Sequence, residues 1–111
     1  MTILAERKCI PCEEGGDPLT PDLAEALLKK ELVNGWMLID NAHILVKEFR
    51  FADFAQAMGF ANKVAAIAEE EGHHPDLTIG WGTASVELTT HSVGGLSEND
   101  FIVAAKIDLI T

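Results

Sequence analysis

The sequence predicts an α+β domain of two layers, in which a four-stranded antiparallel sheet carries helices on one face, in the order αββαββα. Apolar residues recur at helical spacing in three stretches, which indicates three helices. Two pairs of short segments rich in strand-favouring residues are each separated by a tight turn, which indicates two hairpins. Because 111 residues fit one domain, these elements are expected to share one core.

The first helix is expected over residues 20–31. Thr20 can cap it, and Pro21 suits its first position because the N–H that a proline lacks would be unpaired there anyway. The stretch is followed by "NG", which favours a stop. Residues 1–19 are expected to form an irregular N-terminal segment, so that the folded domain spans residues 20–111.

Two hairpins are expected, one on each side of the second helix. The segments "WMLID" and "HILVKEF" are separated by "NA" after Asp40, and "LTIGW" and "ASVELTT" are separated by Gly82. Each pair predicts two antiparallel strands joined by a short turn. A sheet built from them would leave a face or an edge to be solvated or paired with another subunit.

The second helix is expected within "ADFAQAMGFANKVAAIAEEEG", with Asp53 at or near its N-cap and with Gly72 and Pro75 ending it. The last helix is expected from Ser97 onward, because Ser97 and Asp100 form an S-x-x-D pattern that resembles a capping box. The apolar residues at helical spacing in the second helix are Phe54, Ala57, Met58, Ala61, Val64, Ala65 and Ala68.

Charge and hydropathy exclude several classes of function. The formal net charge is −10, from 18 acids and 8 scattered bases, which disfavours binding to nucleic acid or to an anionic membrane surface. No apolar run approaches the roughly 20 residues that a membrane span needs. The N-terminus lacks a basic start followed by an apolar stretch, so it does not resemble a secretory signal. The expected location is the cytoplasm.

Three histidines are expected to meet at the open end of the second hairpin. If the turn centres on Gly82, His73 lies opposite His91, with His74 beside them. Directly opposed residues of an antiparallel ladder lie about 5 Å apart. Each charged imidazolium makes the next one harder to protonate, so some members act as bases while others act as acids near neutral pH. Such a cluster suits a reaction that moves protons.

Other interpretations of the same residues compete with this one. Adjacent histidines after a helix are often solvated residues that favour its C-terminal dipole when charged. Three histidines also suit catalytic zinc, although neighbours in an extended segment point to opposite sides. Cys9 and Cys12 form a lone C-x-x-C that could recruit His43 or a partner chain for a metal. An ordered tail with reduced thiols is the favoured interpretation, and no metal is expected.

The spacing of several residues resembles the signature of the pterin-4a-carbinolamine dehydratases. The resemblance covers roughly residues 20–111 and includes "HHPDLTIGW" and "LTTHSVGGLSENDF". The C-x-x-C resembles what some bacterial members carry before the domain. The signature positions are Glu69, His73, His74, Pro75, Trp81, His91 and Asp100.

The resemblance implies an antiparallel four-stranded sheet with helices on one face, and a homodimer or homotetramer. It implies dehydration of 4a-hydroxytetrahydrobiopterin to quinonoid dihydrobiopterin, without a cofactor. This recycles the pterin of aromatic amino-acid hydroxylases, so phenylalanine hydroxylase and dihydropteridine reductase are the implied functional partners.

The resemblance also implies roles for individual residues. His73, His74 and His91 form the implied catalytic cluster, with His74 as the base or principal substrate contact and the other two as acids at the hydroxyl. Glu69 either orients an imidazole or is a solvated acid, and Asp100 caps the last helix, orients His91, or both.

The resemblance implies one supporting aromatic residue and five substrate-binding residues in addition. Trp81 is expected to support the site as a packing or interface aromatic rather than as a surface on which the pterin stacks. The implied substrate-binding residues are Glu69, Pro75, Thr90, Ser92 and Val93.

Two further functions stay open at this stage. Some relatives are partners that stabilise a transcription-factor dimer, and distant ones act in RuBisCO assembly. A partner of that kind has no need of three histidines at one site, so the cluster favours the enzyme. A dehydratase acting on another pterin is the second possibility.

Overall fold

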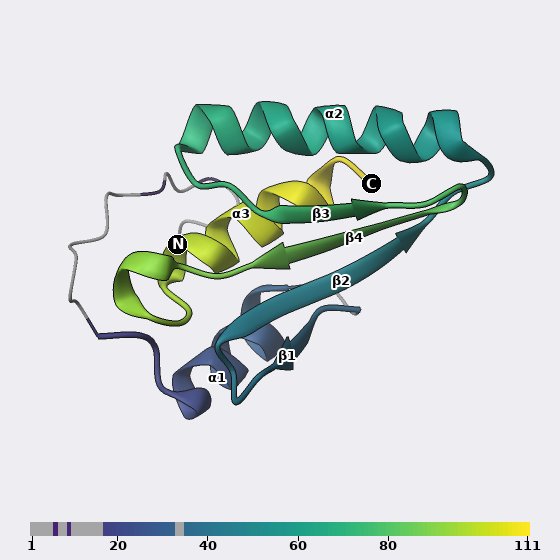
Figure 1. Cartoon of the computed structure of the whole chain (residues 1–111). Coiled ribbons are helices and arrows are strands. Elements are labelled where there is room, and N and C mark those ends of the chain that lie inside the picture. Colours follow the sequence, from purple (N-terminus) through teal and green to yellow (C-terminus); the bar gives the residue numbers. More distant parts are fainter. Residues whose placement is uncertain (1–5, 7–8, 10–16, 33–34) are drawn as a thin grey trace.

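The computed structural model of the chain describes residues 6, 9, 17–32 and 35–111. Within them the elements follow the predicted order αββαββα, with one short 3-10 turn, η2, added before the last helix (Figure 1). The elements are α1 (Pro21–Glu31), β1 (Met37–Ile39), β2 (Ile44–Arg50), α2 (Phe54–Glu71), β3 (Asp76–Ile79), β4 (Thr83–Leu88), η2 (His91–Val93) and α3 (Glu98–Leu109).

The four strands form one antiparallel sheet in the order β1-β2-β4-β3. The two predicted hairpins are therefore joined through β2 and β4, and β1 and β3 are the edges. Along β4 the buried residues Ala84, Val86 and Leu88 alternate with more exposed ones, as expected for a sheet that is covered on one face. The α+β architecture predicted from the sequence is confirmed.

The core is centred on α3, which contacts both α1 and α2. Every residue from Asn99 to Ala105 is buried, so this helix is covered all round rather than along one stripe. The helix α2 packs on β3 and β4. Its apolar surface is wider than this contact requires: Ala57, Val64 and Ala68 are buried, but Phe54 and Met58 are exposed.

The predicted helix ends are confirmed in detail. The Thr20 hydroxyl accepts from the Leu23 N–H at the start of α1, and the Asp53 carboxylate accepts from the Gln56 N–H at 2.8 Å at the start of α2. Gly72 ends α2 in the left-handed conformation, with φ of 67°, which a residue without a Cβ adopts at little cost.

The predicted register of the second hairpin is wrong by one residue. Ile79 pairs with Ala84, and the Gly80 N–H donates to the Thr83 carbonyl at 2.9 Å. The turn therefore has two central residues, Trp81 and Gly82, and the hairpin centre lies between them rather than on Gly82. A one-residue slip exchanges the two faces of a strand, so this difference matters at the site.

Candidate active site

His73 is placed by the way α2 ends. Beyond the left-handed Gly72, the His73 N–H donates to the Ala68 carbonyl at 3.2 Å, which fixes the backbone of His73 to the last turn of the helix. Pro75 then keeps the chain extended into β3. The His73 side chain is 14 % exposed, so this imidazole faces inward.

The inward imidazole meets a carboxylate that is fully buried. His73 Nε2 lies 2.5 Å from Asp100 Oδ1, and the Asp100 side chain has no exposed area. The other oxygen, Oδ2, accepts from the Thr90 hydroxyl at 2.7 Å and from the Ser97 N–H at 3.0 Å. Buried charges persist when they are paired and hydrogen-bonded, and the Asp100 carboxylate meets both conditions.

These contacts assign chemistry to the two nitrogens of His73. An ionised carboxylate only accepts hydrogen bonds, so Nε2 carries a hydrogen toward Asp100. The remaining ring nitrogen, Nδ1, is then the one that can take up or release a proton. A carboxylate that holds an imidazole in one tautomer and one orientation is a common arrangement for general acid/base chemistry.

His74 faces the other way and is paired with a different acid. Its Nε2 lies 2.5 Å from Glu69 Oε2, and the two side chains are 60 % and 76 % exposed. Neighbouring residues in an extended segment point to opposite sides, which separates the environments of His73 and His74. The histidine doublet thus presents one buried imidazole on Asp100 and one exposed imidazole on Glu69.

His91 lies beyond the end of β4, in η2. Continuing the observed β3–β4 register puts Thr90, not His91, opposite His73, which corrects the expected pairing. The side chain at position 90 then reaches Asp100, whereas the next residue, His91, is exposed. Asp100 therefore orients His73, and the expectation that it orients His91 is not what its contacts show.

The segment after Thr90 forms a small closed loop. Thr90 and Gly95 pair as an isolated antiparallel bridge, with the Thr90 N–H donating to the Gly95 carbonyl at 2.7 Å. Ser92 and Val93 lie within this loop and are half-buried. Figure 1 shows this loop beyond the end of β4, on the side of the molecule where α2 ends and β3 begins.

Trp81 lies away from the histidines, and Thr90 makes two contacts that the sequence did not predict. Trp81 is 72 % exposed and lies in the turn at the far end of the β3–β4 hairpin, so its supporting role stays a prediction (Figure 1). Two hydroxyl contacts were not foreseen: that of Thr90 with Asp100, and that of Thr90 with Ser97, whose oxygens lie 2.8 Å apart. The S-x-x-D pattern marked Ser97 and Asp100, but only as a helix cap.

The possible metal ligands are dispersed in the described residues. There, no group of three or more His, Cys, Asp or Glu side chains is arranged to hold a metal ion. Cys12 falls outside the described residues. The Cys9 sulfur lies 3.6 Å from the Asn99 carbonyl oxygen, and His43 Nδ1 lies 2.7 Å from the Asp40 carbonyl oxygen in the β1–β2 turn.

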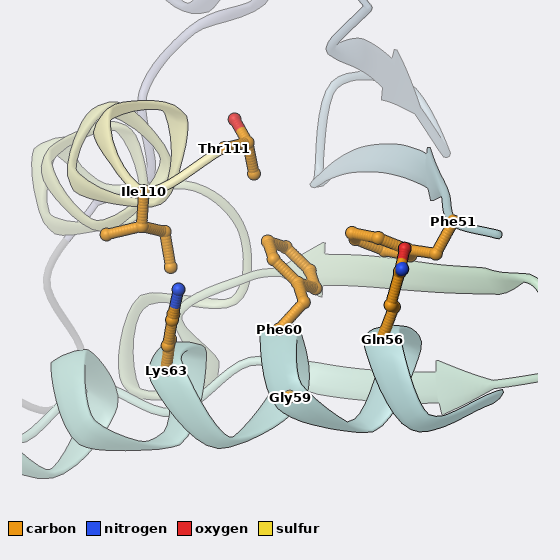
Figure 2. Close-up of a pocket in the computed structure, with 7 residues that line it drawn as sticks. All are labelled: Phe51, Gln56, Gly59, Phe60, Lys63, Ile110 and Thr111. Atoms are coloured by element: carbon orange, nitrogen blue, oxygen red, sulfur yellow. The ribbon is translucent and has the colours of Figure 1, made fainter. Parts of the chain in front are cut away.

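A pocket of about 320 Å³ lies elsewhere, between α2 and the end of α3 (Figure 2). It is lined by Phe51, Gln56, Gly59, Phe60, Lys63, Ile110 and Thr111. Lys63 is the one ionisable side chain among these residues, and no histidine is present. Because proton transfer needs groups that exchange protons near neutral pH, the His73–Asp100 pair at the other end of α2 is the better candidate for the site.

No helix of the described residues is both long and apolar enough to cross a membrane.

Comparison with known proteins gives one family. The sequence model described as pterin 4 alpha carbinolamine dehydratase matches residues 17–110. A Rickettsia canadensis (strain McKiel) protein, provisionally named a pterin-4-alpha-carbinolamine dehydratase, is 53 % identical over 97 % of this chain and 97 % of its own length. A Nitrosomonas eutropha protein with the same provisional name is 50 % identical over 96 % of this chain and 92 % of its own length.

Two solved structures with a similar fold have names that refer to pterin dehydratases. A transcriptional coactivator/pterin dehydratase from Brucella melitensis superposes with a TM-score of 0.77 at 32 % identity, covering 85 % of this chain and 98 % of that one. A pterin dehydratase-like protein identified as a RuBisCO assembly factor in the alpha-carboxysome superposes with a TM-score of 0.60 at 27 % identity, covering 69 % and 89 %. The fold, the matched residues and the identities together place this chain in the pterin 4 alpha carbinolamine dehydratase family.

Proposed function

We propose that this protein dehydrates 4a-hydroxytetrahydrobiopterin to quinonoid dihydrobiopterin by histidine-based general acid/base catalysis, without a cofactor. The observation that carries the proposal is His73, held through Nε2 on the buried carboxylate of Asp100 at 2.5 Å. In this reaction the bond from carbon 4a to the hydroxyl breaks, a ring nitrogen loses its proton, and water leaves. One group must supply a proton and another must accept one.

The arrangement of the histidines supports a division of these tasks. His74 is the proposed base or principal substrate contact, because it is exposed to an incoming ligand. His73 and His91 are the proposed acids at the hydroxyl. Asp100 holds His73 in one orientation through Nε2, while the exposed Glu69 orients His74.

The proposed substrate contacts lie on the two segments that flank the histidines. Pro75 follows His74 directly, and Thr90, Ser92 and Val93 belong to the bridge and loop after β4. Backbone N–H and C=O groups on these segments suit the polar edge of a pterin ring. Glu69 is the fifth proposed contact, through its carboxylate.

The same proposal includes a physiological setting. The protein would act in the cytoplasm as a homodimer or homotetramer. Its product would be reduced by dihydropteridine reductase and reused by phenylalanine hydroxylase. The names of the Rickettsia and Nitrosomonas relatives support the pterin part of this proposal, and a dehydratase acting on another pterin is its nearest variant.

A second candidate function is a binding role, as a coactivator-like or assembly partner. The names of the two structural neighbours favour it, since one is called a transcriptional coactivator and the other an assembly factor. The exposed apolar residues Phe54 and Met58 on α2 are the kind of surface that such a role uses. A binding role does not need the paired histidines, so we favour the dehydratase as the function of this protein.

The decisive experiment is a direct optical assay of dehydration with freshly formed 4a-hydroxytetrahydrobiopterin. Wild type should accelerate the reaction, and each of H73A, H74A and H91A should reduce that acceleration. E48A, at an exposed position of β2 that pairs with Ser85 rather than with the histidine segments, is the matched control. A wild-type protein that leaves the spontaneous rate unchanged would remove the dehydratase and leave the binding role.

A further inference from the structure

A second set of contacts lies behind the His73–Asp100 pair, at the ends of the same two helices. The backbone N–H of Cys9 donates to Glu71 Oε1 at 2.8 Å, and Glu71 is the last residue of α2. The Cys9 thiol donates to the carbonyl of Asn99, in the first turn of α3, with a sulfur–oxygen distance of 3.6 Å. One residue of the N-terminal segment therefore contacts both helix ends.

The Glu71 carboxylate is itself shared between two partners. Its side chain is only 3 % exposed, and its second oxygen lies 3.7 Å from Lys106 Nζ on α3. A carboxylate with so little access to water is costly unless it is paired and hydrogen-bonded. The Cys9 N–H and the Lys106 ammonium supply these contacts, so Glu71 links the end of α2 to both the N-terminal segment and α3.

These contacts lie next to the catalytic pair along the chain. Glu71 precedes His73 by two residues, and Asn99 directly precedes Asp100. The His73 backbone follows the end of α2, because its N–H is bonded to the Ala68 carbonyl. The distance from His73 Nε2 to Asp100 Oδ1 therefore depends on how the end of α2 sits against the start of α3.

We propose that Cys9 and Glu71 are positioning residues, whose contacts hold the end of α2 on α3 so that His73 stays on Asp100. The catalytic consequence rests on the proposed dehydratase function, whereas the structural consequence does not. Cys9 lies before residues 17–110, which the family's sequence model matches. Cys9 thus contributes to the proposed site from outside the residues that the family's sequence model matches.

The test uses four variants and one matched control. E71A removes the acceptor of the Cys9 N–H and the partner of Lys106, whereas E71Q keeps an acceptor oxygen. C9A removes the thiol but not the backbone N–H, and C9S restores a donor. The control, N62A, alters an exposed residue of α2 that lies more than two turns from Glu71.

Two readouts separate positioning from general stability. In ¹H–¹⁵N spectra, the His73 Nε2 proton should appear as a slowly exchanging, far-downfield signal that D100N abolishes, which assigns it. E71A should weaken that signal and lower kcat about tenfold with little change in KM, because misplacement affects the transition state more than substrate binding. C9A should weaken the His73 signal and lower kcat by less than E71A does. E71Q should be closer to wild type than E71A in both quantities, and C9S should be closer to wild type than C9A.

Each outcome decides the proposal. A folded E71A and C9A with the wild-type His73 signal would overturn it, and so would an equal loss in N62A. If E71A does not fold, a wild-type signal in C9A would overturn it instead. If wild type lacks dehydratase activity, the proposed function fails, but the His73 signal still shows whether Cys9 and Glu71 hold the pair together.

Discussion

His73 Nε2 and Asp100 Oδ1 lie 2.5 Å apart, although 27 positions separate the two residues in the chain. The contact joins the segment after α2 to the first turn of α3. Asp100 serves two purposes there: its other oxygen accepts the Ser97 N–H and so caps α3. The residue that caps the most buried helix is also the one that orients the inward histidine.

Replacing Asp100 by asparagine should damage catalysis more than folding. The amide keeps the shape, but whichever way it turns it presents N–H donors to the Ser97 N–H or to His73 Nε2, where the carboxylate only accepted. We expect a loss of about 10²-fold or more in kcat, since His73 loses its fixed tautomer. Unfolding free energy should fall by about 1–3 kcal/mol for the unsatisfied buried group.

Steady-state kinetics and urea unfolding of D100N measure these two effects. D22N is the control, because it makes the same change of carboxylate to amide at an exposed position in the first turn of α1, away from the site. Wild-type kcat in a folded D100N would show that the pair is a helix cap alone.

Removing His74 should leave stability nearly unchanged. Its side chain is 60 % exposed and its partner Glu69 is 76 % exposed, and such surface pairs contribute about 0–1 kcal/mol. Activity is different: H74A should lower kcat by about 10²-fold, in line with loss of a general base. E69Q, which keeps an acceptor, should lose much less; near-wild-type turnover by H74A would remove the role that we give to His74.

Exhaustive chelation should leave dehydration unaffected. The proposed steps move protons between imidazoles, the pterin and water, and none of them needs a Lewis acid. The measurement is the dehydration rate before and after dialysis against a strong chelator, with the metal content of each sample. Zinc near one equivalent per chain, lost together with activity, would contradict the metal-free mechanism and revive Cys9 and Cys12 as candidate ligands.

The ion pair between Lys47 and Asp108 should matter to stability rather than activity. The two side chains are 13 % and 7 % exposed, with Lys47 Nζ 3.2 Å from Asp108 Oδ1. Asp108 also accepts from the Trp36 ring N–H at 2.9 Å. K47M would leave a buried carboxylate without its cation, so unfolding free energy should fall by about 3–5 kcal/mol.

Chemical denaturation of K47M measures this loss, and the exposed pair of Lys29 with Glu25 provides the comparison. K29M should change the unfolding free energy by less than about 0.5 kcal/mol, because an exposed pair gains little in water. Equal effects of K47M and K29M would show that burial does not govern the Lys47 pair.

Much of the site could be foreseen because its signals are local. Gly72 and Pro75 mark the helix end that places the doublet, and Ser97 and Asp100 mark the start of α3. The partner of Asp100 could not be foreseen in this way. A hairpin centred on Gly82 puts His91 beside His73, whereas the two-residue turn of Trp81 and Gly82 shifts the register by one and puts Thr90 there instead.

The sequence by itself determined the elements, their order, their caps and the helix break at which the histidine doublet lies. These follow from periodicity and from interactions within a turn of helix, which act over a few residues. Only the tertiary structure decided the strand order, the burial of α3 on all sides, and the contacts of Asp100 with His73 and of Cys9 with Glu71. Those contacts join residues far apart in the chain, and they form only once the helices are packed against the sheet and against one another.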